Sequence, residues 1–214
     1  MCIRDSDKFD QLLKLGVTFT SASEIEEEIK NKKVLFEGAQ GIMLDLDSGT
    51  YPYVTSSTTT AYSASAADVT LTDDDTIMGV VKAYTSRVGE GEFPTELFDE
   101  EADKLRKLGN EFGATTGRNR RVGWIDLAQL RYAIKKSKIN SIVMTKADVL
   151  NGYDKVKVCV GYEIDGIEQK MPFISNDFKK AKPIYKEFDG WNDVFEVNFL
   201  KSVSYTHLTL PTIL

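Results

Sequence analysis

Apolar side chains recur every three or four positions in two stretches of the chain, which is the period of an amphipathic helix. Ile25 and Ile29 stand among Glu and Lys residues, and Ser23 followed by Glu26 has the spacing of a capping box, so a short helix is predicted there. Two later helices are predicted at residues 100–108, which Gly109-Asn110 should end, and around the i, i+3, i+7 series Leu127, Leu130 and Ile134.

Shorter apolar runs that contain β-branched residues predict strands. They are residues 34–36, 77–88 and 142–144, the last of which is predicted to be a buried strand. A late hairpin of residues 156–164 and 168–171 follows, around a turn at Asp165-Gly166. Strands that alternate with helices early and end in a hairpin predict an α/β fold, with a mixed, largely parallel sheet flanked by helices.

Between the first two predicted strands, residues 38–60 show no period and are rich in Gly, Asp, Thr and Ser. We expect a long ordered loop, and loops of that length inside a compact domain are usually functional.

Composition narrows the class of protein. Hydrophobic residues make up 42% of the chain and charged residues 28%, the balance of a soluble globular protein. The net charge is −6 without a basic stripe, which argues against a nucleic-acid partner. No apolar run is long enough to predict a membrane span. The two cysteines form no disulfide framework and have no zinc-like spacing, so we expect a cytoplasmic protein.

The two ends differ in composition and in charge pattern from the rest of the chain. Residues 1–6 and 202–214 resemble translated adaptor sequence, so they are expected to be a non-native leader and tail around a partial domain at residues 7–201. A native edge strand is the alternative for the tail. The single histidine, His207, lies in that tail and is not expected to take part in acid–base chemistry.

A first candidate site is the Gly-Ala-Gln-Gly stretch at residues 38–41, which follows a predicted strand. Small residues around Gln40 would let the backbone approach a ligand, and its amide offers a donor and an acceptor to the edge of a heterocycle. An ordinary strand-to-loop turn is the alternative.

A second candidate is residues 113–121, where two threonines and two glycines stand beside three arginines. Arginine forks bind carboxylate or phosphate bidentately, so this loop is a candidate anion clamp. A solvated basic turn is the alternative.

A third candidate is Thr-Lys-Ala-Asp at residues 145–148, directly after a predicted strand. The Asp148 carboxylate could accept from the two donors of a guanine edge, as in the guanine-reading loop of GTPases. No phosphate-cradling G-x-x-x-x-G-K-[ST] loop occurs in the sequence.

Taken together and in this order, the motifs resemble the adenylosuccinate synthetase family. The resemblance runs from about Asp7 to Lys201 and rests on five segments. They are FEGAQG at 36–41, GTYPYVTSS at 49–57, KAYTSRVG at 82–89 with FPTE at 93–96, GNEFGATTGR at 109–118, and TKADVL at 145–150. The resemblance implies an incomplete P-loop NTPase-like fold and a ligase that forms adenylosuccinate from IMP, L-aspartate and GTP, with Mg²⁺, as a cytoplasmic homodimer.

The resemblance also implies roles for particular residues. The residues implied for IMP are Gln40, Leu44, Thr55, Val88 and Arg118. The loop implied to close over aspartate comprises Ala114, Thr115, Thr116, Gly117, Arg118, Asn119 and Arg120. The residues implied for GTP are Arg120, Lys146, Ala147 and Asp148.

Some family features have no counterpart in this sequence. The N-terminal Gly-Asp-Glu-Gly-Lys-Gly-Lys segment, the catalytic aspartate that also binds Mg²⁺, the general-acid histidine and the arginine donated across the dimer are missing. So is the final Gly-Pro segment of the guanine pocket. Residues 58–68 lack the usual glycines, and Asn119 interrupts the basic run. The resemblance therefore implies a fragment without catalytic residues or metal ligands, and inactive alone. The rival hypotheses are a non-catalytic module that binds guanine nucleotides or purines, and a structural remnant without ligand affinity.

Overall fold

The computed structural model describes residues 3–113, 117–170 and 177–192. In chain order the elements are α1 (Ile3–Lys14), α2 (Ala22–Ile29), η1 (Ile42–Leu44), η2 (Ala61–Ala67), β1 (Met78–Lys82), β2 (Tyr84–Arg87), α3 (Glu100–Gly109), β3 (Arg121–Asp126), α4 (Leu127–Ser137), β4 (Ser141–Thr145), η3 (Ala147–Leu150), β5 (Lys155–Ile164), β6 (Ile167–Gln169), α5 (Asp177–Lys180) and β7 (Lys182–Asp189).

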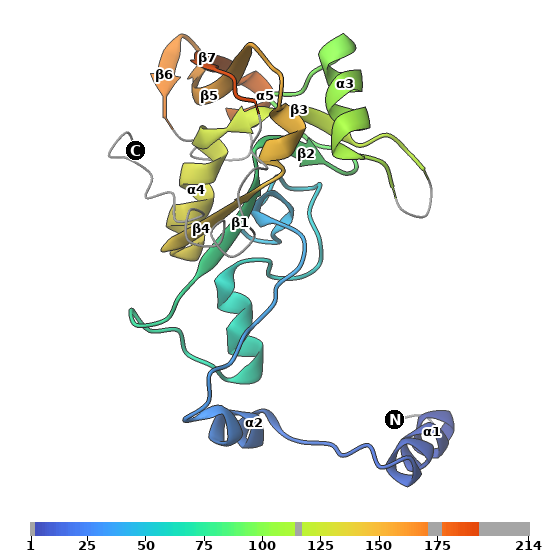
Figure 1. Ribbon diagram of the computed structural model, residues 1–214. Coiled ribbons are helices and arrows are strands. Elements are labelled where there is room, and N and C mark those ends of the chain that lie inside the picture. Colours follow the sequence, from blue (N-terminus) through green and yellow to red (C-terminus); the bar gives the residue numbers. More distant parts are fainter. Residues whose placement is uncertain (1–2, 114–116, 171–176, 193–214) are drawn as a thin grey trace.

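The strands form two sheets (Figure 1). In the smaller sheet β1 pairs in parallel with β4, from Met78 opposite Ser141 to Lys82 opposite Thr145. The larger sheet has the order β2-β3-β5-β6, and β7 also pairs with β5. The pairing is parallel between β3 and β5 and antiparallel between the other neighbours. The mixed α/β class predicted from the sequence is confirmed.

The predicted late hairpin is confirmed as β5 and β6, joined at Asp165 and Gly166. Both turn residues have positive φ, 51° and 81°, which is the conformation of a tight two-residue hairpin turn. The helices predicted at 100–108 and around residue 130 are confirmed as α3 and α4.

The main hydrophobic core lies where α3 packs over β2, β3 and η3. Its fully buried side chains include Tyr84, Leu105 and Leu150, and Trp124 meets Tyr153 edge to face with ring centroids 5.9 Å apart. A second cluster of buried residues lies beneath α4 and includes Tyr162 and Phe178. The core therefore fixes the end of α3 against the strands that lead into the candidate site.

Four predictions of local structure need correction. Ser21 and Glu24, and not Ser23 and Glu26, make the capping box of α2, because both pairs have the spacing and the earlier pair starts the helix. Residues 34–36 form no strand; they are exposed and pair with no described strand.

The predicted strand 77–88 is two strands, because at Ala83 the chain leaves its parallel partner β4 and joins the antiparallel edge of β3. The strand at residues 142–144 exists as β4, but its residues are only half-buried, because β4 belongs to the small sheet.

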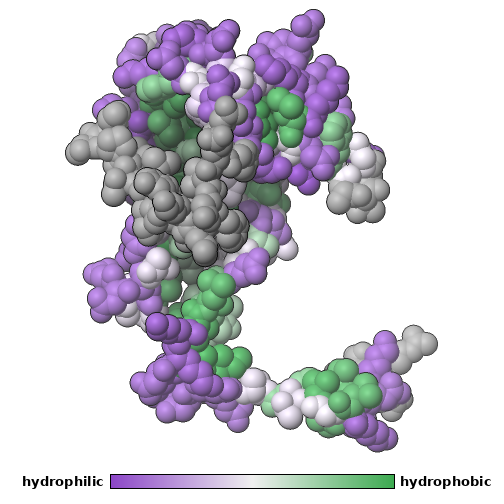
Figure 2. Space-filling view, viewed as in Figure 1, coloured by the Kyte–Doolittle hydropathy of each residue, from purple (hydrophilic) through white to green (hydrophobic). Residues whose placement is uncertain are grey.

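The N-terminal part of the chain extends away from the sheets. Figure 1 shows α1 at the end of an extended stretch, beyond α2. Phe9 stacks on Phe19 at 4.1 Å between ring centroids, yet Leu13 is 48% and Leu15 79% exposed. Figure 2 shows an apolar patch on α1 that is open to solvent. In the described ranges, no helix is both long enough and apolar enough to cross a membrane.

Candidate functional site

A buried carboxylate lies where three elements meet. Glu111 is 1% exposed, and its Oε1 accepts hydrogen bonds from the Lys82 ammonium at 2.6 Å and from the Tyr84 hydroxyl at 2.5 Å. Its Oε2 accepts from Arg120 Nη1 at 3.0 Å. Burial disfavours the charged carboxylate, but these donors outweigh burial and hold the pKa of Glu111 below its usual value. The cluster therefore contains an ionised carboxylate at neutral pH.

The backbone around Glu111 joins α3 to the candidate anion loop. Asn110 ends α3 in the left-handed conformation, and the Glu111 N–H donates to the Arg106 carbonyl. The Glu111 carbonyl accepts from the Arg120 N–H at 3.0 Å. The backbone of Glu111 thus bonds both to the last turn of α3 and to the base of the next loop.

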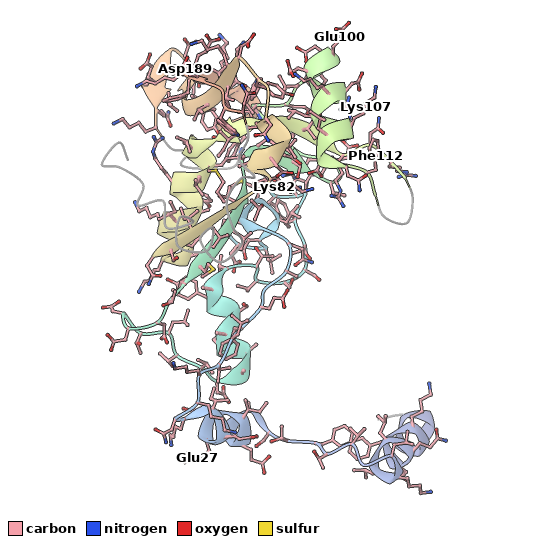
Figure 3. All side chains as sticks on the ribbon, viewed as in Figure 1. Glu27, Lys82, Glu100, Lys107, Phe112 and Asp189 are labelled. Carbon is pink, nitrogen blue, oxygen red and sulfur yellow. The ribbon has the colours of Figure 1, made fainter. Side chains whose placement is uncertain are left out.

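That loop is a hairpin closed by main-chain contacts. Phe112 and Asn119 form an antiparallel bridge, and the Gly113 N–H donates to the Arg118 carbonyl at 2.9 Å. Figure 3 shows Phe112 below the end of α3, where the hairpin begins. Gly117 has a φ of 65° and donates to the Gly113 carbonyl at 2.8 Å.

The predicted aspartate-site residues are placed unequally. Ala114, Thr115 and Thr116 lie outside the described residues. Gly117, Arg118 and Asn119 are exposed on the second arm of the hairpin, and Arg120 is half-buried at its base. The predicted GTP and aspartate residues share Arg120, which contacts the Glu111 cluster directly.

The predicted guanine loop lies against the same end of α3. Lys146, which directly follows β4, has a φ of 59°, and its Nζ donates to the Gly109 carbonyl at 3.1 Å. The Ala147 carbonyl accepts from the Trp191 indole N–H at 3.1 Å. Asp148 is exposed in the turn of η3. The loop is therefore anchored on both sides, while the carboxylate predicted to meet guanine stays open to solvent.

An electrostatic contact links this loop to the Glu111 cluster. Burial raises the pKa of Tyr84, and the negative charges of Glu111 and Asp148 raise it further. Tyr84 therefore keeps its proton at neutral pH and donates it to Glu111 in a hydrogen bond. The negative charge of Asp148 adds to the effect on the pKa of Tyr84.

The predicted IMP residues begin in a loop organised by Asp45. This side chain is 1% exposed, and its carboxylate accepts from the backbone N–H groups of Asp47, Ser48 and Thr59. Burial opposes ionisation, but these bonds hold the pKa of Asp45 below its usual value. The long ordered loop predicted for residues 38–60 is present, with the short helix η1 within it.

Within this loop, the structure brings Leu44 and Thr55 together. The Thr55 N–H donates to the Leu44 carbonyl at 2.7 Å, and both residues are half-buried. Gln40 is exposed just before η1 with a φ of 61°, so its amide is open to solvent.

Val88 is placed next to this loop by hydrogen bonds of its neighbour Arg87. Arg87 is buried, and its guanidinium donates to Thr50 Oγ1 at 3.0 Å and to the Tyr53 carbonyl at 3.3 Å. Val88 itself is 66% exposed. Arg87 therefore fastens the end of β2, and Val88 with it, to the turn that precedes Thr55.

Sequence reasoning assigned no role to Glu111, Arg87 or Trp191. Glu111 and Arg87 stand inside the quoted motifs, at 109–118 and 82–89. For Glu111 the available signal was a lone acidic residue in a stretch of uncharged ones. Trp191 gave no signal, because its contact with Ala147 spans 44 positions.

Within the described ranges, no group of three or more His, Cys, Asp or Glu side chains is arranged to hold a metal ion.

Comparisons of this chain with family profiles and with known proteins all identify the same family. The profile of the adenylosuccinate synthetase family matches residues 3–205. An adenylosuccinate synthetase of Finegoldia magna is 94% identical over 206 residues, which cover 96% of this chain and 49% of that protein. The Petrotoga mobilis enzyme of the same name is 54% identical over 196 residues, 92% of this chain and 47% of its own length.

A solved structure agrees with these relatives. Fully ligated adenylosuccinate synthetase from Plasmodium falciparum superposes with a TM-score of 0.73 at 38% identity, over 80% of this chain and 42% of that chain. The chain thus spans about half the length of the curated relatives it matches.

Proposed function

The chain belongs to the adenylosuccinate synthetase family, and we propose that it forms about half of an enzyme that joins L-aspartate to IMP with GTP. In the proposed reaction the γ-phosphoryl group of GTP moves to the 6-oxygen of IMP. The aspartate amine then displaces that phosphate, which leaves GDP, phosphate and adenylosuccinate, the first committed product on the way from IMP to AMP.

The observation that carries the proposal is the meeting of two predicted loops at one helix end. Lys146 of the guanine loop donates to Gly109, the last residue of α3. Arg120 of the anion hairpin is held by Glu111, two residues further on. A nucleotide whose base reaches Asp148 would therefore have its phosphates or its co-substrate near Arg120.

The proposed roles follow from side-chain chemistry. Asp148 would accept from the N1–H and N2–H₂ donors of guanine, with Lys146 and Ala147 beside the base. Arg118 and Arg120, with residues 114–117 and 119, would hold the aspartate carboxylates through charge-assisted hydrogen bonds. Gln40, Leu44, Thr55 and Val88 would contact IMP, and Arg118 would approach it as well.

The positive charge of the hairpin suits this chemistry. A dianionic amino acid that attacks an anionic phosphorylated intermediate needs fixed donors to stabilise the charge that gathers in the transition state. A hairpin that closes over the site would also exclude water, which would otherwise hydrolyse the intermediate.

The remaining parts of the enzyme would come from beyond this chain's described residues. We propose that Mg²⁺ and the acid–base residues are supplied by the half of the family protein that this chain does not match. A cytoplasmic homodimer is proposed for the full-length protein. The second candidate is a non-catalytic guanine-nucleotide module that would use Asp148 in the same way.

Isothermal titration calorimetry on the 214-residue chain tests the shared premise of both candidates. We expect GTP to bind, and ATP to bind at least about 100-fold more weakly, because adenine lacks the two adjacent donors of guanine and would cover the Asp148 carboxylate without pairing with it. Asp148→Ala is the matched control and should lose the preference. Equal binding of GTP and ATP, or no binding of either, would reject guanine recognition by this chain.

A further inference from the structure

The three donors that converge on Glu111 come from parts of the chain with different predicted tasks. Lys82 ends β1, Tyr84 begins β2, and Arg120 closes the anion hairpin. The Lys82 ammonium also donates to Ser86 Oγ at 2.8 Å, so Lys82 is fixed independently of Glu111. Arg120 is the donor whose side chain also belongs to a predicted ligand site.

Only some of the N–H donors of the Arg120 guanidinium have a hydrogen-bond partner among the described residues. Nη1 donates to Glu111, while about a third of the side chain is exposed, at 34%. Its Nε is buried without a hydrogen-bond partner in the described part of the chain. A planar guanidinium that is held at one nitrogen has its remaining N–H groups fixed in direction, which is the condition for bidentate binding of an anion.

Glu111 itself is inaccessible to ligands. Its side chain is 1% exposed, and both oxygens are occupied by donors. It can therefore affect a ligand only through the groups that it holds. Its backbone also pairs with Arg120, whose N–H donates to the Glu111 carbonyl, and Arg120 is itself one of the predicted site residues.

We propose that Glu111 is a positioning residue, which orients the Arg120 guanidinium toward the phosphate or carboxylate of a ligand bound at the hairpin. This inference rests on the proposed function for the identity of the ligand, but the contact itself can be tested without one. Glu111 Oε1 also accepts from the Tyr84 hydroxyl, so a second, separate donor fixes the carboxylate at this oxygen while Arg120 binds Oε2.

The test compares Glu111→Gln with Glu96→Gln in the 214-residue chain. Glu96 is a matched control, because it is a partly buried carboxylate paired with the neighbouring Arg121, to which no ligand role is assigned. Each variant replaces one carboxylate by an amide of the same shape. In Glu111→Gln a single acceptor oxygen remains where three donors converge, so Arg120 loses its fixed partner.

The first measurement needs no ligand. Nitrogen-15 NMR of arginine side chains should show hindered rotation about the Cζ–Nε bond of Arg120 in the wild-type chain and in Glu96→Gln. The rotation should be free in Glu111→Gln. Free rotation of Arg120 in the wild-type chain, or unchanged hindrance in Glu111→Gln, overturns the proposal.

The second measurement uses GTP and guanosine as probes in calorimetry. Glu111→Gln should weaken GTP binding at least about tenfold and leave guanosine binding within about twofold, because only GTP carries the anion that Arg120 meets. A merely structural role would weaken both ligands alike, and that result overturns the proposal.

A double-mutant cycle separates action through Arg120 from action by another route. Glu111→Gln should add nothing to the loss of GTP affinity that Arg120→Ala already causes. A further loss in the double variant overturns the proposal. If the wild-type chain binds neither probe, guanine recognition fails for this chain, and the NMR measurement alone then supports or overturns the positioning of Arg120 by Glu111.

Discussion

Asp148 is an exposed carboxylate on a loop that is held in place by its neighbours. Lys146 is tied to the end of α3, and Ala147 is tied to Trp191. Asp148 is thus presented by an anchored backbone while its side chain remains open to solvent. That arrangement suits a residue that reads the edge of a base, since the loop need not reorganise when the ligand arrives.

This geometry predicts a change of base preference in Asp148→Asn. The carboxylate is acceptor-only and suits the two donors of guanine, whereas asparagine offers one donor and one acceptor and suits xanthine. We expect the GTP-over-XTP ratio of kcat/KM to fall by about 10⁴-fold or to reverse. The assay requires a chimera in which this chain replaces the matching half of the Finegoldia magna relative.

The alternative for Asp148 is a local role in the turn of η3. In that case Asp148→Asn would lower thermal stability and leave the GTP-to-XTP ratio unchanged. A melting curve recorded beside the kinetics distinguishes the two, and an unchanged ratio would exclude base reading by Asp148.

The sequence was sufficient to select candidate ligand residues but not the groups that hold them. Asp148 and Arg120 carry recognisable chemistry in short motifs. Glu111 acquires its importance from Lys82 and Tyr84, which lie 29 and 27 positions away. Pairwise contacts at such separations have no local pattern, so sequence reasoning on residue types alone does not find them. The ligand roles themselves stay predictions.

The start of α4 shows how one side chain can serve a helix and the core together. Asp126 caps α4 by accepting from the Gln129 N–H at 3.0 Å, and it accepts from the buried Tyr162 hydroxyl at 2.5 Å. Removing the carboxyl in Asp126→Ala should cost roughly 2–4 kcal/mol, about 1 for the lost cap and about 1–3 for the stranded hydroxyl. Urea unfolding followed by tryptophan fluorescence measures this loss.

The protonation of Asp126 gives a pH-dependent prediction. Burial raises the pKa of Asp126 above its ordinary value of 3.8, although hydrogen bonds from Tyr162 and Gln129 oppose the shift. A raised pKa contributes stability that is fully present below pH 3.8 and is lost as pH rises through the folded-state value. Asp126→Asn keeps an acceptor for the cap and does not titrate, so its stability relative to wild type should rise across that window. A stability difference that does not change with pH would contradict the assignment.

Elements with strong local signals were predicted well, and elements that depend on partners were not. The helix α3 has an acidic N-cap and a Gly-Asn stop, α4 has a periodic apolar face behind the N-cap Asp126, and the β5–β6 turn requires two residues with positive φ. The division of residues 77–88 into β1 and β2 is decided by two different partner strands. Residues 34–36 have strand propensity but pair with no described strand, and β-propensity mainly measures packing against such neighbours.

The molecule exposes large apolar side chains on β1 and near the end of its N-terminal part. Met78 is 55% and Val80 72% exposed on β1, although parallel strands are usually covered on both faces. Leu13 in α1 and Leu15 just after it are exposed, and Figure 2 shows an apolar patch on this helix. The family relatives are about twice as long as this chain. We expect these surfaces to contact the remainder of a full-length family protein.

The chain by itself is not expected to catalyse the ligase reaction. With GTP, IMP, L-aspartate and Mg²⁺, the 214-residue chain should release no phosphate and form no adenylosuccinate above a heat-inactivated control. Its sequence contains no G-x-x-x-x-G-K-[ST] phosphate loop, and its described residues hold no metal-binding cluster. General acid–base groups typically contribute about 10²–10⁴-fold, and positioning of the phosphates adds further orders of magnitude. The chimera with the Finegoldia magna relative should restore turnover, because the two sequences are 94% identical over the shared half. Turnover by the isolated chain would show that the catalytic groups lie within it. An inactive chimera that still folds would instead place the defect in the few substituted positions or in the two terminal segments.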